Sequence, residues 1–265
     1  MTPLVAPLFV PGDRPERFAK AAASGTDMVV IDLEDAVAKD AKAAARMAAV
    51  EYLAAPGVAV VRVNAPSSPE FADDLAALAR VQPAAIMIPK FETVAQAAAV
   101  RNACGEETTL IALIETPGAF ENLAPLLREA RVLQAAVGTI DLAAELDCEP
   151  DSAIIDHTRC QAVMASRIAG LAGPLDGVTT NVADPGAAAA DAKQSRRLGF
   201  HGKLCIHPRQ VDPVRAAFRP QAEEIEWARS VVARVREGVA SLAGEMIDAP
   251  VIRRARRILD QAGHP

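Results

Sequence analysis

The sequence predicts a (β/α)8 TIM barrel with a C-terminal helical extension, and three observations carry this prediction. Short apolar runs alternate with Ala-rich amphipathic stretches, eight such pairs fit within residues 1–220, and the pattern changes after Pro220. Continuous apolar runs between helices are typical of parallel strands that are covered on their outer face. Eight strand–helix pairs in a chain of this length favour a closed barrel over a doubly wound sheet.

Each expected strand is a short apolar run, and each expected helix is the amphipathic stretch that follows it. By periodicity alone, the run at 28–31 fits a buried helix equally well. The strands are expected at 5–10, 28–31, 58–63, 84–88, 110–114, 132–137, 177–179 and 203–206. The helices are expected near 15–24, 40–54, 70–80, 92–102, 118–129, 153–169, 185–198 and 209–217.

The C-terminal segment does not continue the strand–helix pattern. One long helix is expected over 221–240, with glutamates early and arginines late, an order that the helix dipole favours. A basic helix near 251–262 follows the sequence GEMIDAP, and no strand is expected in this tail. We therefore expect a barrel domain at 1–220 and an extension at 221–265, which either caps the barrel or packs on a neighbouring subunit.

Composition excludes several classes of function. The chain has 265 residues, of which 51% are hydrophobic and only 3% aromatic, so small aliphatic side chains must build a large core. A net charge of −6 argues against a nucleic-acid-binding surface. The apolar first ten residues are too short to span a membrane and lack the features of a secretion signal, so we expect a cytoplasmic protein. The four cysteines have no zinc-type spacing, which favours buried, inert thiols.

Polar side chains follow nearly every predicted strand at its C-terminal end. Because the chemistry of such a barrel takes place at that face, we expect these side chains to converge on one opening. A single carboxylate there is better explained as part of a solvated loop, but a ring of opposite charges suits a small anion together with a cation. The polar strand ends lie at 32–35, 62–64, 89–90, 115–116, 138–141, 180–181 and 207–208.

Glu115 and Asp141 follow two consecutive predicted strands, so they should be neighbours at the rim. Two adjacent carboxylates repel each other unless a cation or a shared proton lies between them. Mg²⁺, or Mn²⁺ in its place, suits this arrangement because one or two carboxylates hold it while substrate and water supply the other oxygens. The alternative is a salt bridge from Arg62 or Lys90.

Arg62 ends a predicted strand, and its planar guanidinium is suited to holding a carboxylate in a bidentate manner. The competing interpretation is a structural ion pair with Glu34 or Asp35. The two are compatible, because an arginine that is fixed along one edge still presents its other edge. Glu34 and Asp35 are also candidates for orienting water molecules on a metal ion.

The motifs that carry these residues form a recognisable set: LFVPGDRPERFAKA, DMVVIDLEDAV, VRVN, IPKFET, LIETPGAF, GTIDLA, LGFHGKLCIHPRQV and MIDAP. With them the chain resembles the citrate lyase beta-subunit family and its malyl-CoA and citramalyl-CoA lyase relatives. The resemblance implies a (β/α)8 barrel assembled as trimers or hexamers. It also implies a magnesium-dependent lyase that cleaves a 3-hydroxyacyl-CoA thioester into an acyl-CoA and a 2-keto acid by retro-Claisen type chemistry.

The resemblance also implies residue roles at the barrel mouth. Arg62 holds the carboxylate of the substrate, while Glu115 and Asp141 hold the metal. The substrate pocket is completed by four further residues at the strand ends, namely Glu34, Asp35, Gly138 and Thr139. The sequence TIDLAAELD departs from the commoner form of the family, which puts the shape of the loop around Asp141 in question.

Two more sites follow from the resemblance. An aspartate of the C-terminal segment, supplied by a neighbouring subunit, has the acid–base role in this group of lyases, and Asp248 is its counterpart. The alternative for Asp248 is a helix N-cap. Arg14, Arg17 and Lys20 surround the start of the first helix, where CoA phosphates are implied to bind. An exposed charged helix face would look the same.

Other functions remain open at this point. A citrate lyase beta subunit would act on a citryl thioester of an acyl-carrier protein. A metal-dependent aldolase would act on free hydroxy-keto acids without CoA. A barrel retained only for binding or regulation would show no dependence on metal.

Overall fold

The computed structural model describes residues 1–55, 57–236, 241–242 and 245–263. The chain divides into two compact units, Met1–Arg215 and Ala216–Pro265. Each unit is described by itself below. The predicted domain boundary at residue 220, and the packing of the extension on a neighbouring subunit, stay predictions.

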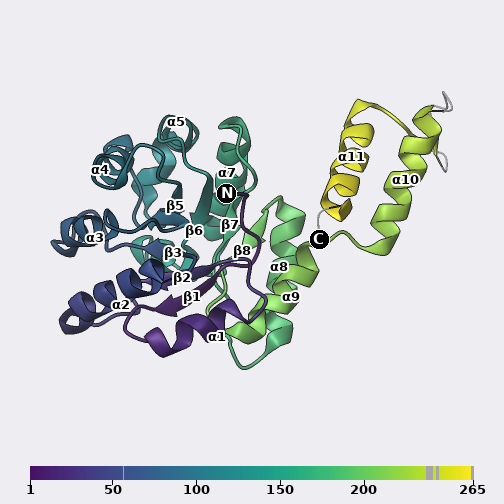
Figure 1. Cartoon of the computed structure of the whole chain (residues 1–265). Coiled ribbons are helices and arrows are strands. Elements are labelled where there is room, and N and C mark those ends of the chain that lie inside the picture. Colours follow the sequence, from purple (N-terminus) through teal and green to yellow (C-terminus); the bar gives the residue numbers. More distant parts are fainter. Residues whose placement is uncertain (56, 237–240, 243–244, 264–265) are drawn as a thin grey trace. The chain divides into compact units, whose positions relative to one another are not determined.

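The first unit is a barrel of eight parallel strands that pair in sequence order (Figure 1). A parallel bridge between Leu8 and Cys205 closes the barrel, and the backbone N–H of Phe9 donates to the carbonyl of Cys205 at 2.8 Å. The predicted fold class is therefore confirmed. The strands are β1 Leu8–Pro11, β2 Val29–Asp32, β3 Ala59–Arg62, β4 Ala85–Ile88, β5 Leu110–Ile114, β6 Gln134–Val137, β7 Leu175–Asp176 and β8 Gly202–Lys203.

Small and branched aliphatic side chains fill the barrel interior. Val30 of β2 and Val60 of β3 are fully buried in this cluster, together with Leu113 of β5. Side chains two residues apart on a strand point to the same face. Asp32 and Arg62 therefore face the same interior at the C-terminal rim, which is how β2 and β3 bring opposite charges into the barrel mouth.

Helices surround the strands, as Figure 1 shows. The predicted helices of this unit are all present, and one further helix, α6, was not predicted. It begins two residues after β6, so it occupies a stretch that the sequence interpretation treated as loop. The helices are η1 Pro15–Arg17, α1 Phe18–Ala22, η2 Lys39–Ala41, α2 Lys42–Ala54, α3 Glu70–Leu78, α4 Val94–Cys104, η3 Pro117–Asn122, α5 Leu123–Glu129, α6 Thr139–Glu145, α7 Ala153–Ile168, α8 Pro185–Leu198 and α9 Pro208–Phe218.

The seventh and eighth strands lie earlier in the sequence than predicted. The expected strand at 177–179 is a loop, and β7 instead contains Leu175 and Asp176. Asp176 is tolerated there because Arg159 of α7 donates two hydrogen bonds to its carboxylate, at 3.1 and 2.6 Å. The search for apolar runs therefore missed β7, because one of its two residues is a carboxylate that pairs with an arginine.

The second unit contains two helices, α10 Ala222–Arg236 and α11 Ala249–Gly263. Ala228 and Val231 of α10 pack with Ala255 and Ile258 of α11 in a small apolar core. The prediction that this tail has no strand is wrong, because the two-residue strands β9 Ser241–Leu242 and β10 Glu245–Met246 pair antiparallel. The end of the helix predicted over 221–240 falls on 237–240, outside the described residues.

Gln134, at the start of β6, ties the N-terminal segment to the barrel. Its fully buried amide accepts from the N–H of Leu4 at 2.8 Å and donates to the carbonyls of Leu4 and Gly173. We predict that Gln134→Met lowers the free energy of unfolding by roughly 2–3 kcal/mol, because a buried donor and two acceptors lose their partner. Urea unfolding measures this, with exposed Gln82→Met as the matched control; equal stability of the two variants would contradict it.

Candidate active site

Arg62 lies at the centre of a cluster of carboxylates at the barrel mouth. Its Nε and Nη2 donate to the two carboxylate oxygens of Asp32, both at 2.7 Å. Its Nη1 donates to Oδ2 of Asp35 at 3.3 Å and lies 3.2 Å from Oε2 of Glu34. The ring of Phe9 lies below the guanidinium, with its centroid 5.0 Å from Cζ. The structural ion pair offered as one interpretation of Arg62 is therefore formed, and Arg62 also lines the pocket. Its binding of a substrate carboxylate stays a prediction.

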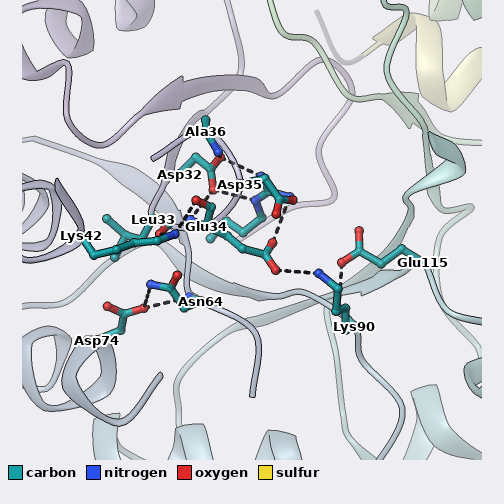
Figure 2. A network of polar contacts seen from close by, with 11 residues as sticks. Asp32, Leu33, Glu34, Asp35, Ala36, Lys42, Asn64, Asp74, Lys90 and Glu115 are labelled. Atoms are coloured by element: carbon teal, nitrogen blue, oxygen red, sulfur yellow. Dashed lines mark hydrogen bonds and ion pairs between the residues drawn. The ribbon is translucent and has the colours of Figure 1, made fainter. Parts of the chain in front are cut away.

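Asp32 is the main partner of Arg62, and the sequence interpretation missed this role. The two residues are register partners on β2 and β3, a signal that strand parity alone would have supplied. Asp32 also accepts the backbone N–H groups of Glu34 at 2.9 Å and Ala36 at 3.0 Å (Figure 2). Burial alone would raise its pKa, but Arg62 and these two donors hold the pKa of Asp32 below its usual value.

Lys42, the first residue of α2, was also missed. Its Nζ donates to the carbonyls of Leu33 at 2.7 Å and Glu34 at 2.5 Å (Figure 2). Asp32 thus binds the backbone N–H groups of this loop, and Lys42 binds its carbonyls. The loop is held from both sides, which fixes its backbone and the position of the buried Glu34.

A second network links the neighbouring strand end to the helix layer. Asp74 of α3 is fully buried and accepts from the backbone and side-chain nitrogens of Asn64, at 2.8 and 2.7 Å. Arg46 of α2 donates to the other oxygen of Asp74 at 2.8 Å. These contacts hold the chain just after Arg62 against two helices.

Lys90 contacts two acidic residues of the site, one through its side chain and the other through its backbone. Its Nζ donates to Oε1 of Glu34 at 3.0 Å, and its backbone N–H donates to Oε1 of Glu115 at 2.9 Å. Its backbone is left-handed, with φ +48°, a strained conformation for a lysine. Among the described residues, no ion pair joins Lys90 or Arg62 to Glu115 or Asp141, so the salt-bridge alternative for the two carboxylates is not formed.

Glu115 is buried at the end of β5, with 1% of its surface exposed. Its Oε2 is buried and has no hydrogen-bond partner. Burial raises the pKa of Glu115 to about 8, and the negative charges of Glu34 and Asp141 add to this rise. Gly138 is required beside it, since a Cβ there would lie 2.5 Å from Oε2.

Asp141 lies in the first turn of α6, whose N-cap is Gly138 and whose first residue is Thr139. A helix N-terminus favours a carboxylate in this position. The helix also answers the question about the shape of this loop, because TIDLAAE is helical from its first residue. Glu115, Asp141, Gly138 and Thr139 all line one pocket.

The pair of carboxylates fits a hard divalent cation. Glu115 offers an oxygen without a hydrogen-bond donor, and the charge of Asp141 is near enough to raise the pKa of Glu115. In the described part of the chain, no three His, Cys, Asp or Glu side chains gather to hold a metal. Two carboxylates, with water and ligand oxygens completing the shell, is the arrangement in which Mg²⁺ is commonly bound.

The pocket has a volume of about 390 Å³ and also includes Phe9, Asp35, Arg62 and Ile206. It suits a small organic acid, because charged groups lie on its wall and apolar side chains from β1, β5 and β6 form its floor. Across the mouth, His207 accepts the backbone N–H of Arg209 through Nδ1 at 3.2 Å. This contact agrees with a loop-holding role for His207.

The predicted CoA-binding residues lie on the segment after β1. Arg14, Arg17 and Lys20 are all exposed on η1 and α1. The contacts of Arg14 and Arg17 with neighbouring acidic residues are long: Nε of Arg14 lies 3.9 Å from Oδ1 of Asp13, and Nε of Arg17 lies 3.7 Å from Oε1 of Glu16. Contacts of this kind contribute little stability, so these side chains are available to a ligand.

Asp248 belongs to the second unit. It is exposed, and its Oδ1 accepts the backbone N–H of Val251 at 3.0 Å at the start of α11. The N-cap geometry that was the alternative for this residue is therefore present. N-capping uses one carboxylate oxygen, so it does not by itself exclude an acid–base role for the other.

The barrel fold and the acidic site at its mouth place the chain in the class of α/β-barrel proteins with a candidate active site at the C-terminal ends of the strands. Residues 6–208 match the family described as HpcH/HpaI aldolase/citrate lyase, and the chain belongs to this family. It is 37% identical over 265 residues to the citrate lyase subunit beta-like protein of Mycobacterium tuberculosis strain H37Rv, covering 97% of this chain and 94% of that protein. It is 33% identical over 269 residues to a (3S)-malyl-CoA thioesterase of Cereibacter sphaeroides, covering 96% and 93%.

Solved structures agree with this assignment. The CitE protein of Mycobacterium tuberculosis in complex with magnesium, acetoacetate and coenzyme A has a TM-score of 0.88 and 34% identity, and the match covers 98% of both chains. A citrate lyase beta subunit from the same organism, complexed with oxaloacetate and magnesium, has a TM-score of 0.73 and 35% identity, covering 81% of this chain and 96% of that one. The predicted enzyme class, a lyase of the citrate lyase beta type, is confirmed, and magnesium and CoA occur in the related structures.

The length and hydropathy of the helices bear on whether the chain could cross a membrane. In the part of the chain that the structure describes, no helix is both long and apolar enough to cross a bilayer.

The buried position of Glu115 predicts an unusual titration. In metal-free protein, we expect one glutamate carboxyl to titrate near pH 8 because burial and two neighbouring charges disfavour its ionised form. NMR of protein labelled with ¹³C at glutamate Cδ measures this, and the signal should vanish in Glu115→Gln. Asp141→Asn should lower the midpoint, since it removes one of the two charges. The expectation fails if every glutamate titrates at ordinary acidic pH.

Proposed function

We propose that this protein is a magnesium-dependent carbon–carbon lyase acting on a 3-hydroxyacyl-CoA thioester of the malyl, citramalyl or citryl type. The products are an acyl-CoA and a 2-keto acid. One observation carries the proposal: the same pocket is lined by a pre-oriented arginine and by two carboxylates, Glu115 and Asp141, for which the described part of the chain supplies no ion pair. The first group suits the carboxylate of a keto acid, and the second suits a metal ion.

Each residue has a task that follows from its surroundings. Glu115 and Asp141 would hold Mg²⁺, which when bound supplies a Lewis acid that lowers the pKa of the substrate hydroxyl. Arg62 would bind the substrate carboxylate, with Asp32 fixing the guanidinium plane. A base must take the proton of the substrate hydroxyl as the carbon–carbon bond breaks, and an acid must protonate the thioester enolate that is left. We assign both transfers to Asp248 of a neighbouring subunit, which would accept the hydroxyl proton as a carboxylate and return it to the enolate.

Glu34, Gly138 and Thr139 complete the proposed pocket in different ways. Glu34 keeps Lys90 and Arg62 in place through contacts of 3.0 and 3.2 Å. Gly138 leaves room for Glu115, and Thr139 begins the helix that presents Asp141. These three residues therefore shape the wall against which the keto-acid half would lie.

The CoA part of the substrate would enter past Arg14, Arg17 and Lys20. Their exposure supports this proposal, as does the related structure that contains coenzyme A. An acyl-carrier thioester is an alternative for the same entrance, since the chain is 32% identical to the citrate lyase subunit beta of Escherichia coli strain K12. A homotrimer or hexamer would bring Asp248 of one subunit to the barrel of another.

Hydrolysis of the thioester is a second candidate activity. The relative from Cereibacter sphaeroides is a (3S)-malyl-CoA thioesterase, and it covers 96% of this chain. The two reactions give different products from the same substrate. A lyase releases glyoxylate and acetyl-CoA from malyl-CoA, whereas a thioesterase releases malate and free CoA.

The assay that tests the proposal follows both products across a small panel of acyl-CoAs, with Mg²⁺ or with EDTA. We expect keto acid without free thiol, and no turnover in EDTA. Asp141→Asn should reduce turnover at least about a hundredfold while leaving urea unfolding nearly unchanged, because Asp141 lies at the rim rather than in the core. Near-wild-type turnover of this variant would refute the ligand assignment, and free thiol with malate would favour the thioesterase.

The proposed role of Asp248 predicts complementation between subunits. Asp248→Ala and Arg62→Ala chains should each be inactive, whereas a mixed oligomer of the two should regain partial activity. The reason is that some sites then combine an intact barrel with an intact tail from another chain. Asp260→Ala, in the same helix, is the control and should stay active. Full activity of Asp248→Ala alone would leave only the N-cap role.

A further inference from the structure

We propose that Asp35 occupies, in the free protein, the edge of Arg62 to which a substrate carboxylate binds, and that the substrate displaces it. Asp35 would then be a specificity-determining residue rather than only a second-sphere partner of a metal. The inference rests on the proposed function for the chemical class of the ligand, a small 2-keto or hydroxy acid.

The hydrogen bonds that Arg62 already makes limit where a further carboxylate can bind. A guanidinium has five N–H groups in a planar fork. Asp32 uses the edge formed by Nε and Nη2, with two contacts of 2.7 Å. A carboxylate that binds in a bidentate manner to the remaining edge needs Nη1 together with Nη2. Nη1 already donates to Asp35 and lies close to Glu34, so an incoming carboxylate must replace one of the two.

Burial decides which carboxylate moves. The side chain of Asp32 is 2% exposed and accepts two hydrogen bonds from Arg62. The side chain of Glu34 is 7% exposed and accepts a hydrogen bond from Lys90 at 3.0 Å. Asp35 is 54% exposed and makes one long hydrogen bond of 3.3 Å to Nη1. Because the Asp35 end of its ion pair is solvated, breaking that pair costs less than breaking a pair in which both partners are buried. Asp35 is therefore the group that can turn into solvent.

The charge balance of the site explains why displacement is needed. Asp32, Glu34, Asp35, Glu115 and Asp141 surround two cations, Arg62 and Lys90. A further anion would add to an existing excess of carboxylates. When Asp35 moves into water, its charge is screened, and the ligand carboxylate takes its place on Arg62. An acyl group without a carboxylate would break the Arg62–Asp35 contact and offer nothing in return.

The test is the binding of oxalate, a stable dicarboxylate, measured by calorimetry with saturating Mg²⁺. Because Asp35 no longer competes, Asp35→Asn and Asp35→Ala should bind oxalate about two- to fivefold more tightly than wild type. Asp40→Asn, an exposed aspartate on η2, is the matched control and should show no gain.

A double-mutant cycle and a crystal structure complete the test. In the Arg62→Gln background, Asp35→Asn should give no gain, because the competition requires the guanidinium. In crystals of the oxalate complex, the carboxylate of Asp35 should lie beyond hydrogen-bond distance of Nη1. The inference is overturned if oxalate affinity is unchanged or weaker in both Asp35 variants, or if Mg²⁺ affinity without oxalate falls instead. Oxalate binding with this pattern but no thioester turnover would uphold the inference and reject the proposed function.

Discussion

The buried ion pair between Arg62 and Asp32 is the interaction on which the rest of the site depends. It joins register partners at the ends of β2 and β3, where the barrel interior meets the mouth. A guanidinium is tolerated there only because the carboxylate satisfies its charge and two of its donors. Asp32 in turn binds the backbone of the following loop. The Arg62–Asp32 ion pair therefore orients the arginine and also holds the loop that carries Glu34 and Asp35.

The remaining carboxylates make the site incomplete without a cation. Lys90 donates to one oxygen of Glu34 through its side chain and to one oxygen of Glu115 through its backbone, but within the described residues no group donates a hydrogen bond to the other oxygen of either glutamate. Burial and the nearby negative charges raise the pKa of Glu115, so that it readily binds a proton, the smallest cation that this position can take. A divalent ion would fill it with more charge and more ligand positions.

The fold and the outline of the site were accessible from the sequence, and the exceptions have physical causes. Parallel strands that are covered by helices are apolar throughout, so β2 to β6 were identified from their runs. The strand β7 was misplaced because Asp176 interrupts the run and is neutralised by Arg159, which belongs to a distant helix. The helix α6 was missed because it is short and directly follows a strand end that had been interpreted as a metal-binding loop.

The site residues divide along the same line. Arg62, Glu115 and Asp141 were predicted because each follows a strand and has a side chain with obvious chemistry. Asp32 and Lys42 were missed as positioning residues because their partners are decided by register and by the fold of a loop, neither of which is visible as a pattern of residue types.

Two motif residues act on Glu115 through their backbone rather than through a side chain. Gly138 is needed because any Cβ would collide with Glu115, and Lys90 adopts a left-handed backbone so that its N–H meets the same carboxylate. The loops after β4 and β6, which flank the strand that carries Glu115, thus accommodate one buried acid, the first by a left-handed residue and the second by a glycine. A protein has little reason to maintain such geometry around a carboxylate that is only structural, because burying an uncompensated acid is costly. This arrangement is understandable if the free energy lost by burying Glu115 is offset when a cation and a substrate carboxylate bind between Glu115, Asp141 and Arg62.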